Sequence, residues 1–147
     1  MPLAERQATV VWQGDLAHGK GQLSAKSGAF SDLPVTWASR TERSDGMTSP
    51  EELLASAHAS CFSMALSHGL AQGGHAPERL EVTAVCAVDR TDAGLKVASM
   101  ALTVRGKVPG LDQAGFKQAA EAAKDGCPVS GALKNNLQLS VDATLEP

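Results

Sequence analysis

The sequence predicts an α+β fold in which a single domain, residues 1–147, combines a mostly antiparallel sheet with helices. Segments that alternate apolar and polar residues, as half-buried strands do, occur at both ends and in the middle of the chain. One long segment between them has helical spacing instead. A chain of 147 residues is long enough for one domain with a core and too short for two comfortable ones.

Three short strands are expected in the first forty residues. Residues 8–12 form a β-branched run that a Gln-Gly-Asp turn signal closes. Residues 19–25 and 35–39 have similar composition, with a glycine-bearing turn before the first and Pro34 before the second.

The strongest helix signal follows. Ser49 occupies an N-cap position, Pro50 the first helical position and Glu52 the third, which together make a capping box. Gly73 ends the segment and Pro77 prevents the helix from resuming. Apolar residues recur at helical spacing within it: Leu53, Leu54, Ala57, Cys61, Met64 and Ala65. Its many small residues allow another backbone to approach closely, so we expect a central, buried helix.

The rest of the chain predicts two long strands, two helices and a final strand. Residues 80–88 and 95–108 alternate, and an Asp-Ala-Gly sequence between them predicts a hairpin. The remaining elements are a helix over 112–124 capped by Asp112, a short helix that starts at Pro128 with Cys127 as its N-cap, and a strand over 137–143.

Composition excludes several classes of function. The net charge of −3, the pI of about 5.8 and the scarcity of aromatic residues argue against nucleic acid as a partner. No signal peptide or membrane-spanning run is evident, so a cytoplasmic protein with no membrane partner is expected. Three cysteines without a CxxC pair, and histidines without matching spacing, predict neither a disulfide framework nor a metal site, and no cofactor is expected.

The three cysteines occupy different settings. Cys86 lies in an alternating strand and is expected to be a packing residue. Cys127 precedes a helix-starting proline, where free N–H groups lower the pKa of a thiol, yet it could equally be a cap without reactivity. Cys61 lies inside a helix, where most thiols are inert.

Two charged residues strengthen the case for Cys61. An arginine such as Arg40 stabilises a thiolate, and a carboxylate such as Glu51 can hold the guanidinium in place, an arrangement suited to peroxide reduction. Glu51 and Cys61 are ten positions apart, which is roughly 15 Å and about 80° out of phase on one helix. Either the helix bends, or a second subunit supplies Glu51 in a two-fold dimer. His58, three residues before Cys61, could act as a base for its thiol or could simply face solvent or cap a neighbour.

The residues around Cys61 and Cys127 resemble those of the osmotically inducible protein C and organic hydroperoxide resistance family, OsmC and Ohr. The segments that carry the resemblance are 49–66 and 126–130, together with 12–15, 19–21 and 108–110. It implies curved antiparallel sheets around two central helices in an intertwined homodimer. Because Arg40 follows the third expected strand and residues 15–20 contain no arginine, the chain resembles the OsmC subgroup.

By motif position, the resemblance implies that Cys61 is the peroxidatic cysteine and passes through a sulfenic acid. It implies that Cys127 is the resolving cysteine, that Arg40 is the activating cation and that Glu51 orients it. The implied activity is the reduction of organic hydroperoxides, and hydrogen peroxide more weakly, in defence against oxidative and osmotic stress. The resemblance implies a dithiol as the reductant; lipoyl-bearing proteins have this role in the Ohr branch, and for this chain the identity of the dithiol stays open. Two alternatives are a redox-responsive binding protein and a non-catalytic binder of small apolar ligands.

Overall fold

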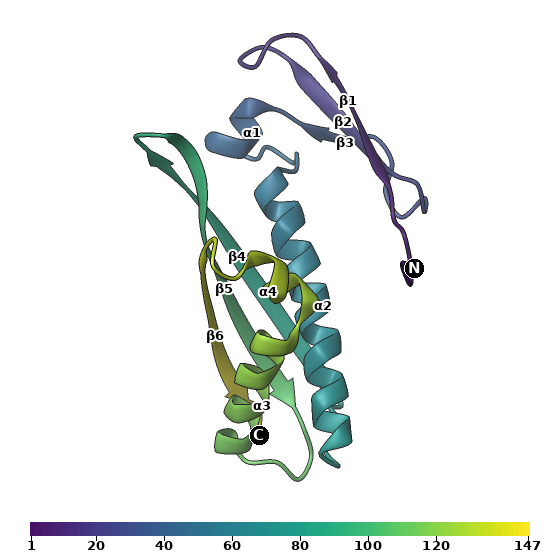
Figure 1. The fold of residues 1–147 in the computed structure, drawn as a ribbon, viewed down its shortest axis with the longest axis vertical. Coiled ribbons are helices and arrows are strands. Elements are labelled where there is room, and N and C mark those ends of the chain that lie inside the picture. Colours follow the sequence, from purple (N-terminus) through teal and green to yellow (C-terminus); the bar gives the residue numbers. More distant parts are fainter. The chain divides into compact units, whose positions relative to one another are not determined.

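The structure is a computed structural model that describes residues 1–147, and it divides into two compact units, Met1–Leu53 and Leu54–Pro147. Figure 1 shows the helices and strands of each unit. No helix in it has both the length and the apolar character needed to cross a bilayer.

The first unit contains a three-stranded antiparallel sheet. Its strands are β1 (Ala8–Gln13), β2 (Lys20–Ala25) and β3 (Leu33–Val35), which lie in that order. The first two expected strands are therefore confirmed. The third ends early, because the segment expected as a strand over 35–39 turns into a helix after Val35.

A short helix, α1 (Trp37–Thr41), replaces the end of that expected strand. Thr36 is its N-cap, and its hydroxyl accepts a hydrogen bond from the Ser39 N–H at 3.0 Å. The Ser39 hydroxyl in return accepts one from the Thr36 N–H at 2.9 Å. This reciprocal capping box satisfies two donors at once and overrides the β propensity of Val, Thr and Trp.

The long helix α2 (Pro50–Gln72) starts where the sequence predicts. The Ser49 hydroxyl accepts a hydrogen bond from the Glu52 N–H at 3.1 Å, as expected of an N-cap. The expectation that α2 is a buried helix is only partly correct. Small and apolar residues occur on every side of α2, so its sequence does not mark the side that is buried. Its fully buried stripe is His58, Phe62, Leu66 and Leu70, whereas Met64 is 73% exposed.

The second unit is built on a sheet of three strands. The strands β4 (Arg79–Thr91) and β5 (Gly94–Lys107) form the expected antiparallel hairpin, and β6 (Gln138–Leu145) pairs with β5 in parallel. Met100, Leu102 and Val104 alternate with exposed residues along β5, so one face of the sheet is buried and the other is open.

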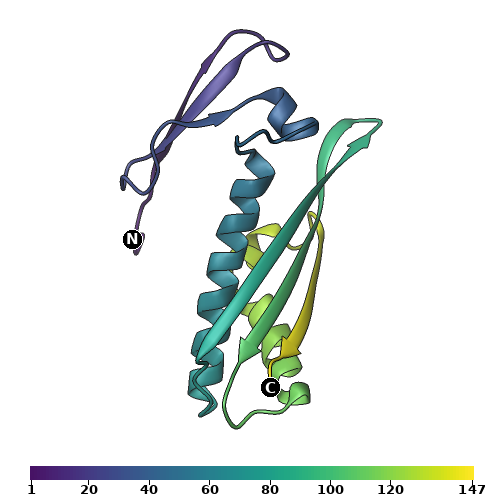
Figure 2. The same cartoon turned by 180° about the vertical axis from the view of Figure 1, so that it is seen from behind.

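Helices cover the buried face of this sheet. Figures 1 and 2, seen from opposite sides, show α3 (Gln113–Gly126) and α4 (Pro128–Leu133) on the same side of the sheet as α2. Phe116 and Ala120 of α3 are fully buried against the strands. A Cβ atom at Gly106 of β5 would lie 2.5 Å from Cζ of Phe116, so this close approach requires glycine there.

Truncating the α2 stripe should destabilise this unit strongly. Leu66 is fully buried in the core between α2, β5 and α3. We expect Leu66→Ala to lower the free energy of unfolding by about 2–5 kcal/mol, through lost transfer energy and the cavity left behind. Urea denaturation measures it, with His68→Ala, exposed on the same helix, as the control. Equal effects of the two substitutions would contradict the assignment of the core.

Candidate active site

The first unit contains the predicted pair of Arg40 and Glu51. The Arg40 Nη2 donates to Glu51 Oε1 at 2.8 Å, and its Nε lies 3.0 and 3.2 Å from the two carboxylate oxygens. The carboxylate is almost fully buried, while the guanidinium remains partly exposed. This forked contact fixes the plane of the guanidinium and leaves its other N–H groups available.

Local hydrogen bonds bring these two side chains together. Arg40 lies in the last turn of α1 and Glu51 in the first turn of α2. The Ser39 hydroxyl donates to the Thr48 carbonyl at 3.0 Å, and the Thr48 N–H donates to the Pro34 carbonyl at 3.1 Å. The ends of β3, α1 and α2 are therefore tied together around the ion pair.

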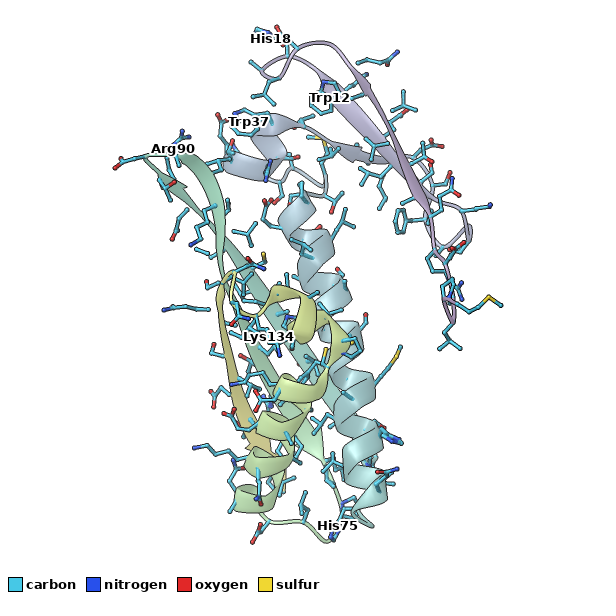
Figure 3. All side chains as sticks on the ribbon, viewed as in Figure 1. Trp12, His18, Trp37, His75, Arg90 and Lys134 are labelled. Carbon is cyan, nitrogen blue, oxygen red and sulfur yellow. The ribbon has the colours of Figure 1, made fainter.

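An apolar pocket of about 380 Å³ adjoins Arg40 within the first unit. Arg40 is the only charged residue among those that line it, and its Cζ lies 5.9 Å from the centre of the Trp37 ring. Figure 3 labels Trp12 and Trp37, which are both lining residues. The other lining residues are Val10, Leu16, Leu23, Val35, Thr36, Pro50 and Leu53. The pocket thus presents one cation to a mainly hydrocarbon-lined space.

The second unit brings Cys61 and Cys127 together as free thiols that lie close enough for each to shift the pKa of the other. Cys61 lies on α2 and is half-buried, whereas Cys127 is 1% exposed. Cys127 is the C-cap of α3 and the N-cap of α4, with Pro128 at the start of α4. This double cap holds its backbone from both sides.

The two thiols have opposite pKa shifts. Burial raises the pKa of Cys61, and its contact with Cys127 raises it further, outweighing a hydrogen bond from the Val129 N–H. Burial acts to raise the pKa of Cys127 as well, but hydrogen bonds from Cys61, from the Ser130 N–H and hydroxyl and from the Val129 N–H outweigh it, so that pKa is lowered. Within this unit, the negative charge therefore favours Cys127.

A buried pair of side chains, His58 and Ser130, lies near the thiols, and the sequence did not predict this pairing. His58 is fully buried, and its Nε2 lies 2.7 Å from the Ser130 Oγ, while its Nδ1 has no hydrogen-bond partner. Burial lowers the pKa of His58, so the imidazole is held neutral. Of the alternatives considered for His58, a solvent-facing side chain is wrong, because the residue is fully buried and its Nε2 contacts Ser130 of α4.

Two predicted contacts are therefore present, between Arg40 and Glu51 in the first unit and between Cys61 and Cys127 in the second. Sequence reasoning missed Ser130, although its place three residues after an N-cap cysteine was a usable signal. Cys86 lies on β4 and faces the same side of the sheet as the partly buried Val82 and Ala84, which fits a packing role. No group of three or more His, Cys, Asp and Glu side chains is arranged to hold a metal ion.

Comparisons with known proteins point in one direction. Residues 43–142 match the profile of the family described as OsmC-like protein. The chain is 42% identical over 128 residues to peroxiredoxin OsmC of Escherichia coli K12, an alignment that covers 87% of this chain and 89% of the relative. It is 26% identical over 123 residues to the organic hydroperoxide resistance protein OhrB of Bacillus subtilis, covering 83% and 88%.

The fold has solved counterparts. The crystal structure of an organic hydroperoxide resistance protein OsmC from Legionella pneumophila superposes with a TM-score of 0.78, covering 98% of this chain and 99% of that one at 24% identity. This similarity confirms the expected α+β fold of the single chain.

Proposed function

Because the chain belongs to the OsmC-like protein family, we propose that it is a thiol-dependent peroxidase that reduces organic hydroperoxides, and hydrogen peroxide more weakly. The observation that carries the proposal is the contact between the Cys61 and Cys127 thiols. One of the two is partly accessible and the other is buried beside it, as a peroxidatic and a resolving cysteine would need to be.

The proposed reaction has three steps. The Cys61 thiolate attacks one oxygen of ROOH; the O–O bond breaks, the alcohol ROH leaves after taking a proton, and Cys61 becomes a sulfenic acid. Cys127 then attacks the Cys61 sulfur, forming a disulfide and releasing water. An external dithiol, such as a lipoyl group, reduces the disulfide and is itself oxidised to a disulfide.

Cys61 needs a cation to react in this way, because burial and Cys127 raise its pKa. We assign that role to Arg40, whose guanidinium Glu51 orients. Glu51 and Cys61 are ten positions apart on α2, which is about 15 Å along a straight helix. We therefore propose that a second copy of the chain supplies Arg40 and Glu51 to each Cys61 in a homodimer.

Exposed apolar side chains support this homodimer. Val10, Val11 and Leu16 of the first unit are 51–60% exposed, and Met64 of the second is 73% exposed. A second copy of the chain would cover such residues, which are costly to leave in water.

The apolar pocket beside Arg40 supports organic hydroperoxides as substrates. An alkyl or aryl group would occupy its hydrocarbon lining while the peroxide oxygens approach the guanidinium. The same pocket would also suit a non-catalytic binder of small apolar ligands. The pair of thiols would also suit a redox-responsive binding protein.

Stopped-flow consumption of cumene hydroperoxide in the presence of dihydrolipoamide tests the function. Repeated turnover is expected, and a single equivalent of oxidation without turnover would support the redox-responsive binding protein instead. A chain with both Cys61 and Cys127 replaced by serine should lose all turnover. The proposal is wrong if the wild-type chain does not react and if the wild-type chain and the double serine variant bind cumene hydroperoxide equally well. The protein would then be a binder of small apolar ligands.

Replacing the resolving cysteine should stall the reaction after its first step. In Cys127→Ser, Cys61 should still react with one equivalent of cumene hydroperoxide but should then persist as a sulfenic acid, because no neighbouring thiol can displace its oxygen. Intact mass spectrometry should show one added oxygen. Formation of a disulfide at normal speed would show that Cys127 is not the resolving residue.

A further inference from the structure

Three buried groups form a continuous line from α2 to the start of α4. The His58 Nε2 lies 2.7 Å from the Ser130 Oγ. Ser130 lies three residues after Cys127, the N-cap of α4, and its hydroxyl acts to lower the pKa of the Cys127 thiol. His58 is fully buried, Ser130 is 2% exposed and Cys127 is 1% exposed. Buried polar side chains are costly unless they are paired, so a line of this kind calls for an explanation.

The Nδ1 of His58, which has no hydrogen-bond partner, decides which group donates and which accepts between His58 and Ser130. A neutral imidazole carries one proton, and a proton on Nδ1 would leave a buried N–H donor without an acceptor. We therefore assign the proton to Nε2, which donates to the Ser130 Oγ. The Ser130 hydroxyl has one proton of its own, and with its oxygen already accepting from His58 it can donate that proton toward the Cys127 sulfur.

We propose that His58, acting through Ser130, is a positioning residue that holds Cys127 as the hydrogen-bonded thiolate that resolves the sulfenic acid. This inference rests on the proposed peroxidase function and extends it to residues outside the four predicted ones. The titratable groups that contact Cys127 are Cys61 directly and His58 through Ser130, both on α2. The backbone N–H groups of Val129 and Ser130, at the start of α4, also act to lower the pKa of Cys127.

His58 and Ser130 act on Cys127 in the second step of the reaction, and the charge of His58 does not change. The Cys127 thiolate attacks the sulfur of the Cys61 sulfenic acid; the S–S bond forms, the S–O bond breaks, and the released hydroxide takes a proton from solvent to become water. Burial opposes a charged imidazole, so His58 serves as a fixed donor and does not need to titrate. When the disulfide is reduced, the same donors receive Cys127 as a leaving thiolate.

The first test measures the acidity of Cys127 alone. In a chain with Cys61→Ser and Cys86→Ala, Cys127 is the sole thiol, and its thiolate absorbance can be titrated. We expect His58→Leu to raise the pKa of Cys127 by about one unit. His58→Gln should leave it near the parental value, because the glutamine amide presents an N–H close to the position of Nε2–H. His68→Leu, on an exposed position of the same helix, is the matched control.

Ser130→Ala makes the test independent of how well the histidine variants fold. It should raise the pKa of Cys127 at least as much as His58→Leu does, and adding His58→Leu to it should change nothing more, since the line is already cut. Equal shifts for His58→Gln and His58→Leu, additive shifts with Ser130→Ala, or no shift at all would overturn the proposal.

The second test follows the reaction in the chain with all three cysteines. After one equivalent of cumene hydroperoxide, His58→Leu should form the sulfenic acid at the wild-type rate and the disulfide about threefold more slowly. A tenfold smaller thiolate fraction is offset by the roughly threefold greater nucleophilicity of a more basic thiolate. Equal slowing of both steps would indicate a merely structural role. If the wild-type chain does not react with peroxide, the proposed function fails, while the titration still decides whether His58 acts on Cys127.

Discussion

Peroxide reduction should disappear when Cys61 is replaced by serine. A serine hydroxyl is not ionised near neutral pH and cannot accept an oxygen atom as sulfur does, so neither attack nor formation of a sulfenic acid is available. Stopped-flow mixing with cumene hydroperoxide and dihydrolipoamide measures the loss. Even though Cys127 has the lowered pKa of the two thiols, it is buried, and we do not expect it to replace Cys61.

Cys86 provides the matched control for this substitution. It lies on β4, among side chains that face the sheet's buried side. Cys86→Ser should reduce peroxide within about twofold of the wild-type rate, as expected of a cysteine whose role is packing. If Cys61→Ser retains turnover while Cys86→Ser loses it, the assignment of the reactive thiol is wrong.

Removal of the Arg40 guanidinium should have the next largest effect. The proposed mechanism uses Arg40 both to stabilise the Cys61 thiolate and to favour departure of the peroxide oxygen, so Arg40→Leu should slow oxidation of Cys61 by about 10²–10³-fold. Arg40→Lys should recover part of the rate, because it keeps the charge but not the forked contact with Glu51. The second-order rate of reaction with cumene hydroperoxide measures both.

Arg43 offers a comparison a few residues away. It pairs with Asp45 at 3.5 Å on an exposed part of the first unit, so Arg43→Leu should leave the rate unchanged. The role of Arg40 would be contradicted by equal rates for Arg40→Leu and Arg43→Leu.

Subunit mixing decides whether Arg40 and Glu51 act on their own chain or on a second copy. Glu51→Ala and Cys61→Ser should each be nearly inactive as homodimers. In a mixed dimer with shared sites, both lesions fall in one site and the other site is intact, so activity should return. Failure to recover any activity would indicate that each site is formed within one chain.

Local signals predicted most of the elements. The N-cap at Ser49, the turn between β4 and β5 and the N-cap at Cys127 are encoded within a few residues, and the structure has an element boundary at each. The segment after Val35 was predicted wrongly, because its β-branched and aromatic residues masked the capping box between Thr36 and Ser39. A propensity for strands loses to two reciprocal hydrogen bonds at a helix start.

Contacts between distant segments were harder to predict. The stripe of α2 that becomes buried could not be identified, because small and apolar residues surround the helix and periodicity does not distinguish its faces. The pairing of His58 with Ser130 joins residues far apart in the sequence, and no local pattern encodes it. Local reasoning did favour a lowered pKa for Cys127, and the structure has that shift, with Cys61 and Ser130 contributing to it.

In the proposed mechanism, Cys61 and Cys127 form a dithiol that peroxide converts into a disulfide. Its most direct test is to add one equivalent of cumene hydroperoxide to the reduced protein, then record the intact mass and map the peptides without reduction. We expect the loss of two hydrogen atoms per chain and a cross-linked pair of peptides that contain Cys61 and Cys127. An unchanged mass, a cross-link through Cys86, or a lasting oxygen adduct in the wild-type chain would contradict it.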